Sequence, residues 1–219
     1  MKSEFSKNKL IEHYNQKVDY YPEYGLEGWH LRKEVSKISR ILDSILEKKI
    51  CKKALDIACH DGRYSFLLQG KGLDVVGIDT SDKSLAHAES IRKSKKIENV
   101  RFQKMDATEL SFKEKFDIII LMELLHHLPD RLAAQTLWKA LDHLEREGYI
   151  IFDLKNKFNP VISYVYKNKS SQNLLLKTRT MSFYEKAVHD AGARILFKRG
   201  LVTPFWPIEP FVIVVAQKI

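Results

Sequence analysis

Cysteine, proline and glycine are scarce in this chain of 219 residues, which contains two, six and nine of them. Two cysteines, Cys51 and Cys59, cannot build a disulfide framework, so the small disulfide-stapled folds are excluded. No apolar run reaches the roughly 18 residues that a membrane span requires, and no secretory signal opens the sequence. With 44% hydrophobic residues, we expect one domain with a sizeable core, in a reduced and cytoplasmic setting and without an integral membrane segment.

Acidic residues are missing from one long stretch in the last third of the chain. The formal net charge is +9, and residues 151–219 contribute 11 basic and four acidic residues. Residues 154–180 include no acidic residue but six basic ones, namely Lys155, Lys157, Lys167, Lys169, Lys177 and Arg179. A field of that sign attracts anions such as phosphate, acidic lipid or nucleic acid, although an ordinary solvated surface can have the same composition.

Strand-like and helical segments alternate along the chain. Seven short apolar runs are typical of strands, at residues 53–58, 74–78, 100–104, 116–122, 149–154, 194–201 and 211–216. Helical spacing is found at residues 3–17, 29–48, 63–69, 84–94 and 131–145. This alternation favours helices that connect successive strands of one sheet.

The strand pattern predicts an α/β fold. Runs such as FDIIILM at residues 116–122 are almost continuously apolar, which is typical of strands buried on both faces. We therefore expect a three-layer, Rossmann-like fold with a seven-stranded, mostly parallel sheet. The last two strands are joined by VTPFWPIEP, which is too short for a crossover helix, so a C-terminal strand should run antiparallel. Residues 1–50 are expected to form an N-terminal helical cap on a domain of residues 51–219.

The stretch LDIACHDGRYSF, residues 55–66, leads from the first predicted strand through a turn into a helix. Open α/β sheets bind ligands at this edge, outside the carboxyl ends of their strands. A dinucleotide fingerprint would have G-x-G-x-x-G here, but Ala58, His60 and Gly62 stand at alternate positions. The missing glycines argue against a nicotinamide-dependent dehydrogenase.

The same turn resembles motif I of the class I S-adenosylmethionine-dependent methyltransferases, in which an acidic strand end precedes G-x-G-x-G. Asp56 matches the acidic position and Gly62 the last glycine, while Ala58 and His60 replace the other two. Alanine adds only a methyl group where the backbone must approach the cofactor. His60 is the larger departure, because a non-glycine residue is penalised where the backbone needs a positive φ.

Further features of this family follow in the expected order. VVGIDTS places Asp79 23 residues after Asp56, where the family's acidic residue accepts both ribose hydroxyl hydrogens, and VRFQKMDATEL places Asp106 near the adenine amino group. FDIIILMELLHHLPD resembles the fourth motif, and EREGYIIFDLKN resembles the fifth strand. The resemblance covers roughly residues 53–219 and points to small-molecule methyltransferases of the ubiquinone and menaquinone type.

The resemblance implies that S-adenosylmethionine is the cofactor and S-adenosylhomocysteine the product. The implied cofactor-binding residues are Asp56, Ala58, Cys59, His60, Gly62, Asp79, Thr80, Asp106, Ala107 and Met122. Just past the fourth strand, Glu123, His126 and His127 are candidates for removing the proton of the acceptor. No metal is required, because no cluster of His, Cys and carboxylates has ligand spacing along the sequence.

Several of these residues also have simpler interpretations. Asp79 and Asp106 could be helix caps or turn formers, and one of the two histidines could brace its loop. A cluster of aromatic residues could be either ordinary packing of the N-terminal helices or a lid over the cofactor; it consists of Tyr20, Tyr21, Tyr24 and Trp29.

The acceptor is predicted only as a class. In similar chains the segment after the fifth strand, here about residues 155–180, helps to cap the acceptor pocket. Its apolar and aromatic residues beside Lys155, Lys157 and Lys167 suit an amphiphilic anion, so we expect a small-molecule or lipid-like acceptor, including an anionic one. Two alternatives stay open. An RNA methyltransferase fits the charge but lacks the N-P-P-[FY] element, and a non-catalytic S-adenosylmethionine-binding regulatory protein fits the replaced glycines. A monomer or homodimer is expected.

Overall fold

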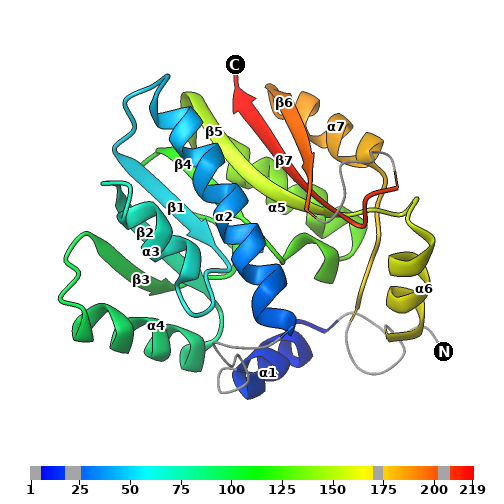
Figure 1. Ribbon diagram of the computed structural model, residues 1–219, viewed down its shortest axis with the longest axis horizontal. Helices are drawn as coiled ribbons and strands as arrows, with labels where there is room; N and C mark the ends of the chain where they lie inside the picture. The colour runs from blue at the N-terminus through cyan, green and yellow to red at the C-terminus, as the bar shows by residue number, and fades with distance from the viewer. Residues whose placement is uncertain (1–5, 18–25, 170–174, 202–207) are drawn as a thin grey trace.

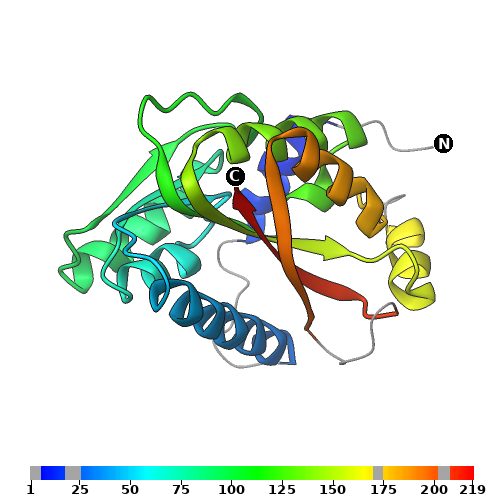
Figure 2. The ribbon, with the colours of Figure 1, turned by 90° about the horizontal axis from the view of Figure 1, so that it is seen from above.

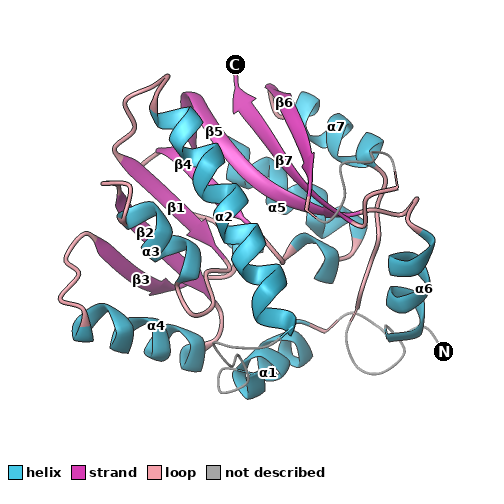
Figure 3. Cartoon of the chain, viewed as in Figure 1, coloured by secondary structure: helices cyan, strands magenta, loops and turns pink. Residues whose placement is uncertain are grey.

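The computed structural model describes residues 6–17, 26–169, 175–201 and 208–219, with the side chains of all of them except 14–17, 26–32 and 169. Its strands form one sheet in the order β3-β2-β1-β4-β5-β7-β6 (Figures 1 and 3). Their bounds are β1 Lys53–Ile57, β2 Asp74–Asp79, β3 Val100–Lys104, β4 Phe116–Leu121, β5 Leu144–Lys155, β6 Ala193–Gly200 and β7 Phe211–Lys218. β7 runs antiparallel to both of its neighbours, and all other neighbouring strands are parallel. The predicted fold class is confirmed.

Helices cover both faces of the sheet and complete the three predicted layers (Figure 2). The helices are α1 Lys7–Lys17, α2 Leu26–Leu46, α3 Arg63–Gln69, α4 Asp82–Ser94, α5 Asp130–Asp142, α6 Pro160–Lys169 and α7 Met181–Asp190, with short 3-10 turns η1 Ala107–Glu109 and η2 Leu125–His127. α2 and α3 pack on one face, and α5 and α7 on the other. None of the described helices is long and apolar enough to cross a membrane.

Each face of the sheet has its own hydrophobic core, because successive side chains of a strand point to opposite sides. In β4, Ile118 and Ile120 pack in the core of α2, whereas Ile119 and Leu121 pack in the core of α5. The apolar stripe of α2 begins at Ile38 and lies in the first of these cores. This helix therefore shares its packing with the sheet, and the predicted division of the chain at residue 50 stays a prediction.

The boundary between α5 and β5 differs clearly from the sequence prediction. Helix α5 ends at Asp142 rather than at residue 145, and β5 begins at Leu144 rather than at residue 149. The strand continues through Glu147, which has a φ of 59°, and the pairing of β5 with β4 shifts register there. A Cβ at Gly148 would lie 2.8 Å from the carbonyl oxygen of Glu145, so the close backbone approach in this bulge requires glycine.

Asp56 in β1 is one of the carboxylic acids buried in the structure. The side chain is 1% exposed, and Ser65 Oγ donates a hydrogen bond to Asp56 Oδ2 at 2.6 Å. Burial raises the pKa of Asp56 to about 7, because the hydrogen bond from Ser65 only partly offsets the loss of hydration. The acid is therefore partly protonated near neutral pH.

This raised pKa makes the stability of the fold depend on pH. The contribution of Asp56 is fully present below its unfolded pKa near 4 and is lost as the pH rises toward 7, with a slope of up to about 1.4 kcal/mol per pH unit. We expect Asp56→Asn to remove this part of the slope, measured as the free energy of urea unfolding between about pH 5 and pH 8. Asp74→Asn, at an exposed position of β2, is the control. Parallel pH curves for Asp56→Asn and the wild type would contradict this assignment.

Candidate active site

The turn between β1 and α3 passes through three residues with positive φ. Ala58, His60 and Gly62 have φ values of 59°, 48° and 80°, in the left-handed region that favours glycine. These are the three alternate positions at which the methyltransferase motif has glycine. The cost at Ala58 is therefore larger than the single methyl group predicted from the sequence, because a left-handed backbone adds roughly 1–2 kcal/mol at a non-glycine residue.

Hydrogen bonds hold the turn in this shape. Cys59 N donates to Ile78 O at 2.9 Å, and Gly62 N donates to Cys59 O at 2.8 Å. His60 N donates to Asp79 Oδ2 at 3.0 Å. The turn is thus left-handed at every glycine position of the motif although two of the glycines are replaced.

Asp79 connects this turn to the next one, at the end of β2. Its Oδ1 accepts a hydrogen bond from Ser81 N at 2.8 Å, while its Oδ2 accepts the bond from His60 N. Each carboxylate oxygen keeps a further lone pair, so Asp79 can also accept hydrogens from a ligand. The residue is a turn former, and this role is compatible with the binding role that the resemblance implies.

Asp106 follows β3 and is bound by the N-terminal helix. Lys7 Nζ lies 2.7 Å from Asp106 Oδ2 and 2.8 Å from Thr108 Oγ1, and Thr108 N donates to Asp106 Oδ1 at 2.8 Å. Partial burial raises the pKa of Asp106, but the hydrogen bonds from Lys7 and Thr108 outweigh it and hold the pKa below its usual range. The carboxylate is ionised and faces a lysine that the sequence analysis did not single out.

These turns surround a cavity at the carboxyl ends of β1 to β4, with about 1230 Å³ of space when its open mouth is included. Nine residues singled out from the sequence lie in its wall, namely Ala58, Cys59, His60, Asp79, Thr80, Asp106, Ala107, Met122 and Glu123. The wall also contains residues that the sequence analysis missed, among them Lys7, Leu10 and Ile11 of α1 and Tyr64 of α3. Backbone turns, the carboxylates of Asp79 and Asp106 and an apolar wall fit a nucleoside joined to an amino acid.

Two predicted cofactor contacts lie behind the turn instead of in the cavity wall. Asp56 is enclosed in the core with Ser65. Gly62 packs on Phe102, whose Cζ atom would lie 2.8 Å from a Cβ at this position. Both residues pack behind the turn, and their direct contact with the cofactor stays a prediction.

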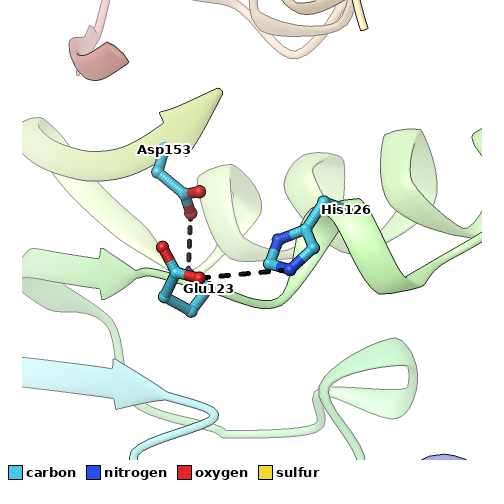
Figure 4. Close-up of side chains that lie close together, drawn as sticks. All are labelled: Glu123, His126 and Asp153. Atoms are coloured by element: carbon cyan, nitrogen blue, oxygen red, sulfur yellow. Dashed lines mark hydrogen bonds and ion pairs between the residues drawn. The ribbon is translucent and has the colours of Figure 1, made fainter. Parts of the chain in front are cut away.

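A cluster of charged residues adjoins the cavity at Glu123, just past β4 (Figure 4). Glu123 has a φ of 58°, and its N donates to Asp153 Oδ1 at 2.7 Å. Lys155 Nζ pairs with Glu123 Oε1 and lies 3.1 Å from Asp153 Oδ2. His126 Nε2 lies 4.0 Å from Glu123 Oε2. The Glu123 side chain is 44% exposed, so it is the member of this cluster that a ligand in the cavity can reach.

The charges of the cluster do not balance. Lys155 is 4% exposed; burial alone would lower its pKa, but Asp153 and Glu123 raise it well above the usual value, so the ammonium stays charged. Glu34 of α2 is also buried nearby and accepts a hydrogen bond from Tyr64 Oη. Burial raises the pKa of Glu34 to about 7, with the charge of Glu123 adding to the effect. Three carboxyl groups thus surround one ammonium, and this end of the cavity has an acidic surplus.

The two predicted histidines lie behind Glu123 and not in the cavity wall. Both are buried, with ring centroids 4.0 Å apart. Burial lowers the pKa of His127 to about 4 and that of His126 well below its usual value, so both are neutral at pH 7. His127 Nδ1 lies 3.2 Å from Leu175 O, which can only accept, so His127 braces the loop. Among the described residues, His126 Nδ1 is buried without a hydrogen-bond partner.

Glu123, His126 and Asp153 have the composition of a metal site, with ligand atoms within 4.8 Å of one another. The sequence analysis did not foresee this cluster, because Asp153 lies in β5, far along the chain from the other two residues. The ammonium of Lys155 already pairs with both carboxylates, and it would repel a metal ion at this position. That no metal is required stays a prediction.

The basic residues of the segment at about residues 155–180 are only partly exposed to solvent. Lys155 ends β5 inside the ion-pair cluster, and the buried Arg179 donates to the carbonyl oxygens of Leu125 and Leu128. Lys177 pairs with Asp130 at 3.2 Å. Lys155 is therefore a buried, paired residue, and the prediction that the lysines of this segment suit an anionic acceptor stays a prediction for Lys157 and Lys167.

The aromatic cluster predicted near the N-terminus cannot be placed. Tyr20, Tyr21 and Tyr24 lie outside the described residues, and the side chain of Trp29 is not among those described. Its role as packing or as a lid stays a prediction.

Comparison with known proteins identifies the family. Residues 48–191 match the family described as "Methyltransferase domain". The chain belongs to the methyltransferase domain family. The resemblance to class I S-adenosylmethionine-dependent methyltransferases is confirmed at this level, and the seven-stranded sheet of this methyltransferase domain agrees with it.

Curated relatives match part of the chain. Ubiquinone biosynthesis O-methyltransferase from Acinetobacter baumannii (strain AYE) is 29% identical over 121 residues, which cover 52% of this chain and 48% of that protein. The protein of the same name from Nitrosomonas europaea is 27% identical over 174 residues, covering 75% and 70% of the two chains. The methyltransferase domain thus spans about half the length of the first relatives it matches.

Solved structures share the fold along nearly the whole chain. Magnesium protoporphyrin IX methyltransferase from Synechocystis PCC 6803, with bound S-adenosylhomocysteine, has a TM-score of 0.77 at 16% identity and covers 98% of this chain and 100% of its own. The protein PH0226 from Pyrococcus horikoshii OT3 has a TM-score of 0.71 at 20% identity, covering 93% and 99%. At these identities the likeness shows the fold alone.

The turn generates a prediction about its glycine positions. We expect Gly62→Ala to lower the free energy of unfolding by about 2–4 kcal/mol, because it adds left-handed strain and a clash with Phe102. We expect His60→Gly to stay within about 1 kcal/mol of the wild type, because relief of strain offsets the added freedom of the unfolded chain. Urea unfolding measures both variants. Equal effects of the two substitutions would refute this account of the turn.

Proposed function

We propose that this methyltransferase domain transfers a methyl group from S-adenosylmethionine to a hydroxyl group of a small or lipid-like molecule. The observation that carries the proposal is the cavity whose wall includes Asp79, Asp106 and Glu123. By the family resemblance, the backbone of residues 58–60 would hold the methionine end, with Asp79 at the ribose and Asp106 at the adenine. The names of the curated relatives, which are O-methyltransferases, support transfer to oxygen.

Glu123 is the residue best placed to accept the proton of the hydroxyl group. The bound cofactor supplies an electrophilic methyl group, so the protein must align the acceptor, exclude water and remove a proton. Lys155 and the backbone contact with Asp153 fix the orientation of Glu123, which makes them positioning residues. His126 lies 4.0 Å from Glu123 Oε2, and because burial lowers its pKa it stays neutral there and acts on Glu123 as a positioning residue.

The charge of the cluster at Glu123 limits which acceptors fit the cavity. An anionic group beside Glu34, Glu123 and Asp153 would be repelled, so the reacting hydroxyl group should arrive in its neutral form. An anionic group elsewhere on the acceptor would have to lie farther out, toward the exposed Lys157 and Lys167. The proposed acceptor therefore has a neutral hydroxyl group. If it is anionic or lipid-like, its charge lies far from that hydroxyl group.

The two alternative functions lose support from the described residues. The left-handed turn is kept at Ala58 and His60, so the replaced glycines no longer favour a regulatory protein that has lost the chemistry. Lys155 and Arg179 are buried and Lys177 is paired with Asp130, which leaves less basic surface for RNA. Both cysteines are free, as the proposed reduced, cytoplasmic setting requires.

Calorimetric titration tests the cofactor site. We expect micromolar binding of S-adenosylmethionine and S-adenosylhomocysteine, and at least a ten-fold loss of affinity in Asp79→Ala, about 1.4 kcal/mol. Asp82→Ala removes an exposed carboxylate that pairs with Lys104, outside the cavity wall, and it should bind like the wild type. Thermal unfolding of both variants controls for damage to the turn. Absence of binding to the wild type, or equal affinity of Asp79→Ala, would overturn the assignment.

Proton removal is tested at Glu123. We expect Glu123→Gln to lower kcat by roughly 10²–10⁴-fold, as measured by release of S-adenosylhomocysteine with a panel of phenolic and hydroxylated acceptors. Cofactor affinity should change little, because the substitution preserves the size of the side chain. His126→Asn should lower kcat less, since His126 acts through Glu123. An unchanged kcat in Glu123→Gln would remove Glu123 from the reaction.

A further inference from the structure

Helix α6 has apolar side chains on the face that points to solvent. Val161 and Tyr164 are 69% and 70% exposed, and Phe158, just before the helix, is 63% exposed. Ile162 and Tyr166 point the other way, toward the protein. A surface helix normally presents polar residues to water, so this outer face is apolar without a partner in the described structure.

The segment that precedes β7 extends the same surface. Asn159 Nδ2 donates to Ile208 O at 2.7 Å, which fixes Ile208 next to the start of α6. The side chain of Ile208 is 57% exposed. We call Phe158, Val161, Tyr164 and Ile208 the α6 patch.

Exposed cations accompany the patch, and no carboxylate occurs on its α6 segment, while Glu209, which follows Ile208, is buried. Lys157 and Lys167 are exposed, on either side of the patch residues along the chain. No acidic residue occurs anywhere in residues 154–180. A protein partner would need apolar and acidic groups at positions that match the patch and its lysines. An anionic bilayer offers both everywhere, with phosphates for the lysines and acyl chains for the apolar side chains.

The position of α6 places this patch close to the reaction centre. The ring of Tyr166, on the inner face of the helix, lies 5.7 Å from the ring of His126, which neighbours Glu123. Figures 1 and 2 both show α6 at one end of the molecule, beyond the end of β5. The patch is thus about one helix diameter from the ion-pair cluster and is open on its outer side.

We propose that the α6 patch docks this protein on the surface of an anionic phospholipid bilayer. The apolar and aromatic side chains enter the interface, while Lys157 and Lys167 pair with lipid phosphates. This binding needs neither cofactor nor methyl transfer, so it goes beyond the proposed function and is tested separately from it. Where the acceptor is lipid-like, as the proposed function allows, docking would bring the cavity to the membrane that contains the acceptor.

Vesicle flotation of the full chain, without cofactor, tests the proposal. The probes are vesicles of phosphatidylcholine alone and vesicles with about one third phosphatidylglycerol, at about 0.05 M and about 0.5 M salt. We expect the protein to float with the anionic vesicles at low salt and to bind at least about five-fold less to the neutral vesicles or at high salt.

Two double variants separate the two contributions. Phe158→Ser with Tyr164→Ser removes the aromatic part, and Lys157→Gln with Lys167→Gln removes the charge; each should weaken binding to anionic vesicles about ten-fold or more. Trp138→Ser is the matched control, because Trp138 is an exposed aromatic residue on α5. All variants should bind S-adenosylmethionine like the wild type, so failed docking and a failed cofactor site give different results.

Three outcomes would overturn the docking proposal. The first is no flotation of the wild type with anionic vesicles. The second is equal flotation of the double variants and Trp138→Ser. The third is a dimer in light scattering that Phe158→Ser with Tyr164→Ser dissociates, because the patch would then be covered by a second copy of the chain.

Discussion

The ammonium of Lys155 is the interaction on which the centre of this protein depends. It lies at the end of a buried strand, pairs with Glu123 and Asp153, and its charge also acts on a third carboxyl group, Glu34. Through these partners it connects α2, β4 and β5. Loss of one partner of a buried ion pair costs about 3–5 kcal/mol, because the other charge remains without compensation. The orientation of Glu123, and with it any proton transfer at the cavity, follows from this one charge.

In the turn after β1, hydrogen bonding offsets backbone strain. Two non-glycine residues, Ala58 and His60, adopt left-handed conformations there. Asp79 offsets part of the cost by accepting a hydrogen bond from the backbone of His60. The same carboxylate thus shapes the first turn and faces the cavity, so the glycines of the motif can be replaced while the acidic residue of the next strand cannot easily be.

The sequence predicts the sheet well, because continuous apolar runs and the spacing of strand-end acids are local signals. It fails where long-range packing decides the role of a residue. In the sequence, Lys155 belongs to a basic segment. Only its position at the end of the apolar run IIFDLK indicates that it is buried with Asp153. The contact of Lys7 with Asp106 joins residues 99 positions apart and leaves no local signal at all. Helix α7 was not predicted, although the helical spacing of Met181, Tyr184 and Val188 was a local signal for it.

The bridge from Lys7 to Asp106 has a kinetic consequence. Helix α1 contributes Lys7, Leu10 and Ile11 to the cavity wall, so it roofs the end at which Asp106 lies. The width of this end of the cavity therefore depends on the position of a helix that lies outside the sheet and its two cores, and the ion pair resists movement of that helix. Because added salt screens the ion pair, it should speed the exchange of a ligand held beside Asp106.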